Sequence, residues 1–310
     1  MARLGYYLLV FPLSHLPLFV LYRFSDLMYL LFITIIPYRK KTIEENILHS
    51  FPDFSKDKRN KLKRDFYRHF ADLLIEGIKN LSISKVELEK RMIIQNPEIM
   101  KDLFDRKKNV ILVSGHFNNW EWLITAQSFL IEHQAFGIGM PLTSQFWDKK
   151  LMERRSRFGM KVIHSKNYKT ELAAYTKEPF AVLTLADQAP SDSNKSYWME
   201  FLNQTTPISF GTEFMANEFD LAVVYFTIHK IKRGYYSIEL KLLSDKPKIL
   251  NHGYLTSEYT SLLEKEIVLN PSQWLWSHKR WKRAIPDNLE TLKKQQKEQF
   301  DKRFRSQAND

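Results

Sequence analysis

His116 and Glu121, within the stretch SGHFNNWE, are the residues whose types and spacing best suit acid–base chemistry. The apolar run 109–114 (NVILVS) predicts a buried strand, after which Gly115 allows a sharp turn. His116 would then emerge at the carboxyl end of the strand, where α/β sheets bind their ligands. A helix is predicted over 119–131, and because His116 precedes it in the turn, Glu121 can come back toward the imidazole. A carboxylate on one ring nitrogen fixes the tautomer and leaves the other nitrogen free to accept a proton.

This arrangement needs no serine or cysteine nucleophile if the hydroxyl of a substrate is itself the nucleophile. The start of the predicted helix also offers free backbone N–H groups for an anion. The alternative is purely structural, with His116 capping the helix and Glu121 on its exposed face. The sequence contains no glycine-rich phosphate loop, no G-x-S-x-G elbow and no H-E-x-x-H motif. Further histidines are scattered without metal-ligand spacing, so we predict no metal: His133, His164, His229 and His252.

Composition narrows the possible partners. The chain has 310 residues, 44% hydrophobic and 26% charged, which suffices for one large α/β domain or two small ones. A formal net charge of +12 favours anionic partners: nucleic acid, phospholipid head groups or an acidic protein. The chain contains no cysteine, which excludes a disulfide scaffold, a thiol nucleophile and cysteine-bound zinc. No DNA- or RNA-binding module is recognisable, so we predict no nucleic-acid partner.

The N-terminal segment is rich in apolar and aromatic residues. Residues 4–21 are mainly apolar but contain two prolines, and the second apolar run, 27–36, is too short to cross a bilayer alone. A spanning anchor, a pair of short helices in one leaflet, a cleaved signal peptide and a buried helix of a soluble protein are all conceivable. We expect residues 1–36 to be a membrane anchor that is shallow or only just spans. The basic cluster 39–41 would suit the cytoplasmic face.

The remaining residues, 37–310, alternate between strand and helix patterns without a linker, which predicts one α/β domain with a mainly parallel sheet flanked by helices. Strands are expected at 109–114, 135–140, 161–164, 180–186, 221–229 and 235–243, the last two forming an antiparallel hairpin. Helices are expected at 57–80, 119–131, 144–158, 168–177, 208–217 and 254–269. A short helix before Pro52 and a solvated helix after residue 288 complete this prediction.

Several segments together resemble a known family. GHFNNWE resembles the His-x4-acid signature of the lysophospholipid acyltransferase superfamily and, more narrowly, of the lipid A biosynthesis lauroyl/myristoyl acyltransferases of Gram-negative bacteria. The strand end LADQ (185–188), the segment FLNQTTP (201–207) and the segment QWLWSHKRWK (273–282) resemble further family motifs in order and spacing. One departure is PLTS (141–144), where the family often has an asparagine pair. The resemblance covers nearly the whole chain.

The resemblance implies a role for each matching residue. His116 would be the general base on the acceptor hydroxyl, and Glu121 the carboxylate that orients it. Arg157, in the segment RFG, would hold a phosphate or stabilise the oxyanion, with a surface ion pair as the alternative. Backbone N–H groups near Asn118 are the other expected oxyanion donors. Asp187 would shape the site, or else cap the following turn.

The expected function is transfer of a fatty acyl chain from a thioester, on acyl carrier protein or coenzyme A, to a lipid hydroxyl. The resemblance favours a lipid A precursor as acceptor, no cofactor, and the cytoplasmic side of the inner membrane. The cations and tryptophans of 273–282 would contact lipid phosphate or an acidic carrier protein. The alternatives are an acyltransferase for a glycerol, amino-acid or glycan lipid, a non-catalytic protein that binds anionic lipid, and a hydrolase that releases fatty acid.

Overall fold

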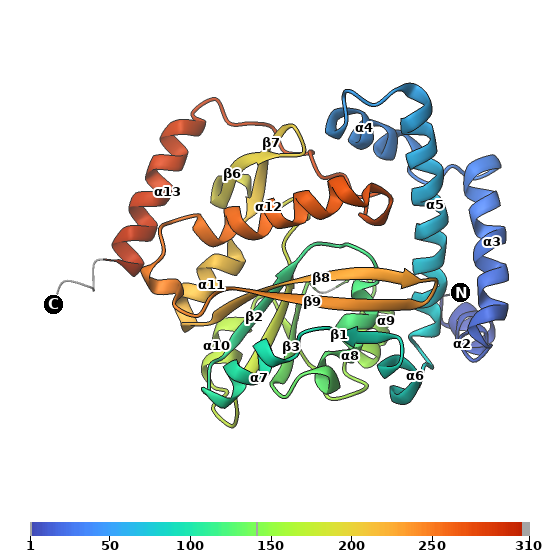
Figure 1. Ribbon diagram of the computed structural model, residues 1–310, viewed down its shortest axis with the longest axis horizontal. Coiled ribbons are helices and arrows are strands. Elements are labelled where there is room, and N and C mark those ends of the chain that lie inside the picture. The colour runs from blue at the N-terminus through green and yellow to red at the C-terminus, as the bar shows by residue number, and fades with distance from the viewer. Residues whose placement is uncertain (1, 141, 306–310) are drawn as a thin grey trace.

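The computed structural model describes residues 2–140 and 142–305, and its centre is a seven-stranded sheet (Figure 1). The strand order is β1-β9-β8-β2-β5-β3-β4, and neighbouring strands are parallel except for the antiparallel pair β8–β9. The strand bounds are β1 Met92–Ile94, β2 Val110–Ser114, β3 Gln134–Gly139, β4 Lys161–His164, β5 Phe180–Leu185, β8 Ala222–Lys232 and β9 Tyr235–Ser244. The prediction of a mainly parallel sheet with a final antiparallel hairpin is confirmed.

Helices cover both faces of the sheet (Figure 1). All five residues of β2 are buried, and the four apolar ones, 110–113, alternate between two hydrophobic clusters, as expected for a central parallel strand. One cluster lies under α4 (Lys40–Ser50), α10 (Tyr168–Ala173), α11 (Gly211–Phe219) and α12 (Tyr254–Leu269). The other lies under α3 (Leu18–Thr34), α6 (Lys85–Glu89), α7 (Glu98–Asp105) and α8 (Trp120–Leu130). The long helix α5 (Lys56–Lys79) contributes to both clusters.

The remaining elements are peripheral. At the N-terminus, α1 (Ala2–Gly5), a π-helical turn (Tyr6–Val10) and α2 (Phe11–Ser14) precede α3. Helix α9 (Gln145–Arg155) connects β3 to β4, and α13 (Leu289–Phe304) ends the described chain, as the predicted C-terminal helix. Short 3-10 turns are η2 (Ser193–Lys195), η3 (Pro247–Ile249) and η4 (Pro271–Gln273).

The sequence pattern missed a second, two-stranded sheet formed by β6 (Ser196–Phe201) and β7 (Gln204–Ser209). The helix predicted over 208–217 accordingly begins only at Gly211. The hairpin loop consists of Leu202 and Asn203, whose φ angles are +51° and +61°. Such positive φ values at both loop residues define the type I′ turn, which asparagine–glycine or glycine–glycine usually signals. Because Leu202 occupies the first position of this turn, the sequence did not indicate a hairpin here.

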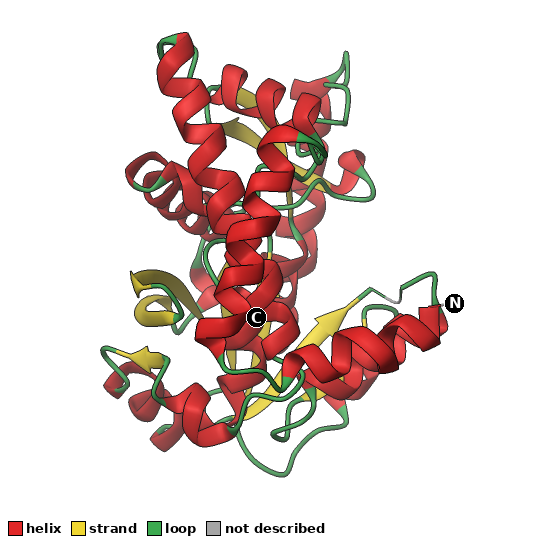
Figure 2. Cartoon of the chain, turned by 90° about the vertical axis from the view of Figure 1, so that its right-hand side faces the viewer, coloured by secondary structure: helices red, strands yellow, loops and turns green. Residues whose placement is uncertain are grey.

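Helix α3 lies alongside α5 at one side of the molecule, where helices dominate the surface (Figures 1 and 2). Leu18 and Leu21 of α3 are buried on the side that faces α5. The hydroxyl of Ser25, also on α3, donates to Oδ1 of Asp72 on α5 at 2.7 Å. Asp72 is buried between these helices, and it also binds Arg233. Among residues 2–140 and 142–305, no helix has both the length and the apolar character that crossing a bilayer requires.

A buried carboxylate on α5 joins four elements. Glu76 is fully buried and accepts hydrogen bonds from Tyr22 on α3 (2.7 Å), Tyr236 on β9 (2.7 Å) and the side chain of Asn119, the N-cap of α8 (2.6 Å). Trp122 Nε1 donates to the Glu76 carbonyl at 2.9 Å. Burial raises the pKa of Glu76 against the opposing effect of these hydroxyl donors. Glu76 therefore fixes the positions of α3 and of the start of α8 relative to α5 and β9.

We predict that Glu76→Ala lowers the free energy of unfolding by about 3 kcal/mol, because buried donors lose their acceptor. Equilibrium urea unfolding followed by tryptophan fluorescence measures this change. Glu290→Ala is the control: its side chain is 85% exposed, and the expected change is within about 0.5 kcal/mol. Equal stability of the two variants would contradict the proposed role of Glu76 in joining the helices.

Candidate active site

His116 and Asp187 meet at the carboxyl ends of two adjacent parallel strands. In the register of β2 and β5, Ser114 lies opposite Leu185, so the residue two positions beyond each strand end reaches the same point. The imidazole Nδ1 lies 2.6 Å from Asp187 Oδ1, and the His116 backbone N–H donates to Oδ2 at 2.8 Å. A Cβ on Gly115 would come within 2.9 Å of Asp187 Oδ2, so the turn between Ser114 and His116 requires glycine.

Asp187 is held as a buried anion. Its side chain is 3% exposed, and Trp274 Nε1 donates to Oδ2 at 2.8 Å. Burial raises the pKa of this carboxyl, but His116 and the hydrogen bonds from His116 and Trp274 outweigh burial and bring it to about 2. An ionised carboxylate accepts the Nδ1 proton, so Nε2 carries the lone pair that a general base needs.

The side of the imidazole that would face a substrate is partly open. Gln188 places its Nε2 3.2 Å from His116 Nε2, and the Trp120 ring packs edge-on at 5.0 Å. The next backbone N–H, of Ala189, donates to His278 Nε2 at 3.0 Å. The amide of Gln188 is therefore a polar donor beside the atom where proton transfer would occur.

Glu121 occupies a different position from the one expected. It is the second residue of α8, and its carboxylate binds Arg154 and lies 2.6 Å from Arg155 Nη2, both on α9. Burial raises the pKa of Glu121, but the two guanidinium groups outweigh burial and lower it to about 2. The prediction that Glu121 orients His116 is corrected in this respect: the carboxylate bonded to the imidazole is Asp187.

Arg157 binds two backbone carbonyl groups. Its two terminal nitrogens donate to the carbonyl oxygens of Asn80 and Ile83, each at 2.7 Å, and burial lowers its pKa. A cation at the carboxyl end of a helix is stabilised by the helix dipole, and these carbonyls follow the end of α5. Both terminal nitrogens of Arg157 are therefore engaged by the backbone in this structure. Arg154, three residues earlier, is the arginine beside Glu121.

Asn118 is buried in the turn with a φ angle of +53°. Its side-chain amide donates to Gln273 Oε1 at 2.8 Å and to the carbonyl of Ile228. The backbone N–H of Asn118 donates to the Gln273 carbonyl at 3.0 Å, and that of Phe117 to the Gly115 carbonyl at 2.8 Å. The backbone N–H groups of Phe117 and Asn118 are therefore already engaged in holding the turn.

A groove of about 690 Å³ passes the candidate site. His116 itself does not line the groove, but Trp120, whose ring packs against the imidazole, does. The lining also includes Glu121, His278 and three cations: Arg39, Lys150 and Arg154. One apolar stripe of α5 forms a wall, opposite the N-terminal residues Tyr6 and Val10 and the α9 residues Trp147 and Leu151. A long, mainly apolar groove edged by cations matches the shape and charge of an anionic amphiphile.

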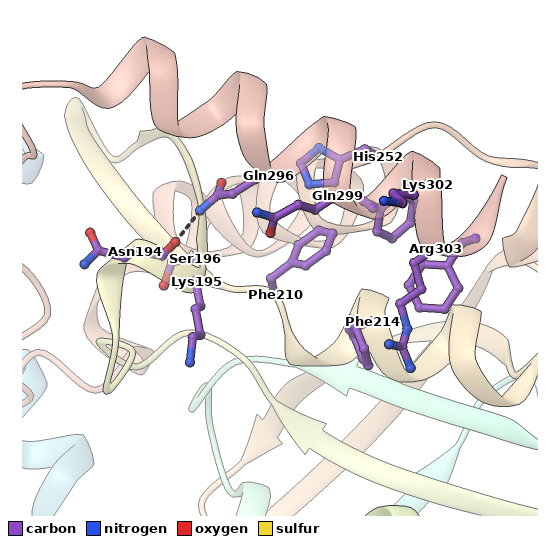
Figure 3. A pocket seen from close by; sticks show the side chains of 12 residues that line it. Asn194, Lys195, Ser196, Phe210, Phe214, His252, Gln296, Gln299, Lys302 and Arg303 are labelled. Atoms are coloured by element: carbon purple, nitrogen blue, oxygen red, sulfur yellow. Dashed lines mark hydrogen bonds between the residues drawn. The ribbon is translucent and has the colours of Figure 1, made fainter. Parts of the chain in front are cut away.

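A second cavity, of about 650 Å³, lies between α11 and α13 (Figure 3). Phenylalanine rings and amides line it, and Arg303 at its rim is bonded to Glu218 at 2.7 and 2.8 Å. No described residue that contacts His116 or Asp187 lines this cavity, neither Trp120 nor Gln188 nor Trp274, so it is separate from the candidate active site.

Sequence reasoning did not single out Gln188, Trp274, His278 or Arg154. The first three lie inside the segments LADQ and QWLWSHKRWK, so the motifs already contained the signal. Arg154 had no comparable signal, because its importance comes from the packing of α9 against α8. The expected roles of Arg157 and Asn118 in substrate binding remain predictions.

A histidine–carboxylate pair at the edge of a parallel sheet, beside an apolar groove, defines the class of α/β enzymes that use a histidine as general base. The family described as bacterial lipid A biosynthesis acyltransferase matches residues 4–283, and the chain belongs to this family. A search of curated proteins finds no match. The protein is thus an acyltransferase, and the resemblance seen in the sequence motifs is confirmed.

We predict that Asp187→Asn lowers kcat by about 10³- to 10⁴-fold, because the imidazole loses the anion that fixes its tautomer. The double variant His116→Ala, Asp187→Asn should be no slower than His116→Ala alone, since the two residues act as a unit. Steady-state acyl-transfer kinetics measures both effects.

Asp192→Asn is the control for this experiment, because Asp192 lies nearby in the chain and its side chain is 44% exposed. Wild-type turnover in Asp187→Asn, or additive effects in the double variant, would contradict the assignment of the pair.

Proposed function

We propose that the protein is a membrane-associated O-acyltransferase that moves a fatty acyl chain from an acyl thioester to a hydroxyl of a lipid A precursor. The observation that carries this proposal is the His116–Asp187 pair, with Nδ1 and Oδ1 2.6 Å apart, beside the apolar groove. A base next to a hydrophobic groove suits a reaction between a hydroxyl and a long acyl chain.

In the proposed mechanism, His116 Nε2 removes the proton of the acceptor hydroxyl. The resulting alkoxide attacks the thioester carbonyl, and the buried Asp187 carboxylate stabilises the imidazolium that forms. The Gln188 amide, 3.2 Å from Nε2, is the proposed donor to the oxyanion. When the tetrahedral intermediate collapses, the ester forms, the carbon–sulfur bond breaks, and the proton on His116 passes to the leaving thiolate.

The groove supports an acyl chain together with an anionic acceptor. Its apolar wall on α5 would receive the hydrocarbon, and Arg39, Lys150 and Arg154 stand at the edge where a phosphorylated head group would lie. The net charge of +12 suits either proposed donor, because acyl carrier protein and coenzyme A are both anionic.

The proposed membrane contact is the outer side of the N-terminal helices. On α3, Phe19 is 73% exposed, Leu27 54% and Leu30 51%, so this helix presents large apolar side chains to its surroundings. The residues at the end of this segment include the basic cluster 39–41, whose charge would attract anionic head groups. We propose that this surface lies in the cytoplasmic interface of the inner membrane, so that lipids enter the groove beside Tyr6 and Val10.

We predict that cells lacking the gene, or carrying His116→Ala, lose one acyl chain from lipid A. Mass spectrometry of total lipids, with lipid A included, measures the loss and gives the chain length. A loss confined to a glycerol, amino-acid or glycan lipid would replace the acceptor and keep the chemistry. An unchanged profile in the His116→Ala cells would overturn catalysis and leave the non-catalytic lipid-binding alternative.

We also predict that the double variant Phe19→Glu, Leu27→Glu binds vesicles of phosphatidylethanolamine and phosphatidylglycerol at least about tenfold more weakly. Burying each large apolar side chain in lipid contributes about 1.5–3 kcal/mol, which the carboxylates remove. Cosedimentation measures binding, and Ile249→Glu is the control because Ile249 is 75% exposed but lies outside this surface. Wild-type binding by the double variant would rule out docking through α3.

A further inference from the structure

One stripe of α5 faces the groove. It consists of Phe70, Leu73, Leu74, Gly77 and Ile78, at the spacing of three and four residues that places side chains on one side of a helix. Leu81, two residues beyond the end of α5, continues the stripe. Every member except Gly77 presents a large apolar side chain. The glycine therefore interrupts an otherwise continuous hydrocarbon wall.

Gly77 is not required by the packing of the helix. A Cβ at this position would have no neighbouring atom within 4 Å, whereas a Cβ on Gly115 would lie 2.6 Å from the Leu263 side chain. Gly77 also lies in regular helix, without the positive φ found at Gly159, Gly234 and Gly253. Glycine in a helix interior destabilises the helix relative to alanine, so what it contributes here is open space in the groove.

That open space lies beside the reaction centre. The preceding residue, Glu76, binds the side chain of Asn119 at 2.6 Å, and Asn80 donates to the Glu121 carbonyl at 3.2 Å. Gly77 is therefore on the part of α5 that adjoins the start of α8. Trp120, which packs against the His116 imidazole, lines the same groove.

We propose that Gly77 is a specificity-determining residue: it leaves room for the transferred acyl chain to pass along α5, and side-chain size at this position sets the longest chain that the groove admits. This inference rests on the function proposed above. If it is correct, replacing Gly77 with alanine changes thermal stability and the transfer of long acyl chains in opposite directions. Gly77→Ala should raise the Tm, because alanine is the better helix former, and it should impair transfer of the longest chains.

The test compares purified wild type, Gly77→Ala and Gly77→Leu with saturated acyl thioesters of increasing length and a lipid A precursor as acceptor. In Gly77→Leu, kcat/KM for the longest chain that the wild type uses should fall at least about tenfold relative to shorter chains. Gly77→Ala should be intermediate. Leu74→Ala, which removes a side chain one turn away on the same stripe, should extend the accepted lengths.

Gly5→Ala is the matched control, because a Cβ on Gly5 also meets no atom within 4 Å but Gly5 does not line the groove. Its chain-length profile should equal that of the wild type. Absence of transfer by the wild type would refute the proposed function itself. With an active wild type, an unchanged profile in both Gly77 variants, or an equal loss for all chain lengths, would overturn the role of Gly77.

Discussion

The buried carboxylate of Asp187 is the interaction on which the arrangement of the site depends. It binds the ring and the backbone N–H of His116 after one strand, and Trp274 of the C-terminal segment donates to the same carboxylate. Three distant parts of the chain thereby converge on one anion. Because an unpaired buried charge is costly, these donors stabilise the site and also fix the tautomer that leaves His116 Nε2 unprotonated.

The helix α5 connects this site to the N-terminal segment. Glu76 and Asp72 on α5 bind Tyr22 and Ser25 on α3, and Glu76 also binds Asn119 at the start of α8. The opposite side of α5 forms the apolar wall of the groove. One helix therefore positions the surface proposed to meet lipid, the wall proposed to receive the acyl chain, and the turn that carries the base.

Most of the sheet was predictable because its signal is local. Central strands such as β2 are continuous apolar runs, and α12 matches its predicted bounds, 254–269. The β6–β7 hairpin was missed because its turn, Leu202–Asn203, lacks the usual glycine. The burial of Asp72 could not be predicted from helical periodicity, because its partners, Ser25 and Arg233, are distant in sequence.

The sequence by itself determined the family, through motifs that span nearly the whole chain, and placed His116 at the end of a buried strand. Only the tertiary structure decided which carboxylate binds the imidazole, because strand order makes β5 the neighbour of β2 and brings Asp187 to His116. The packing of α9 against α8 likewise directs Glu121 to Arg154. Residue spacing along the chain specifies local geometry, whereas partners across a sheet or between helices depend on how the elements pack.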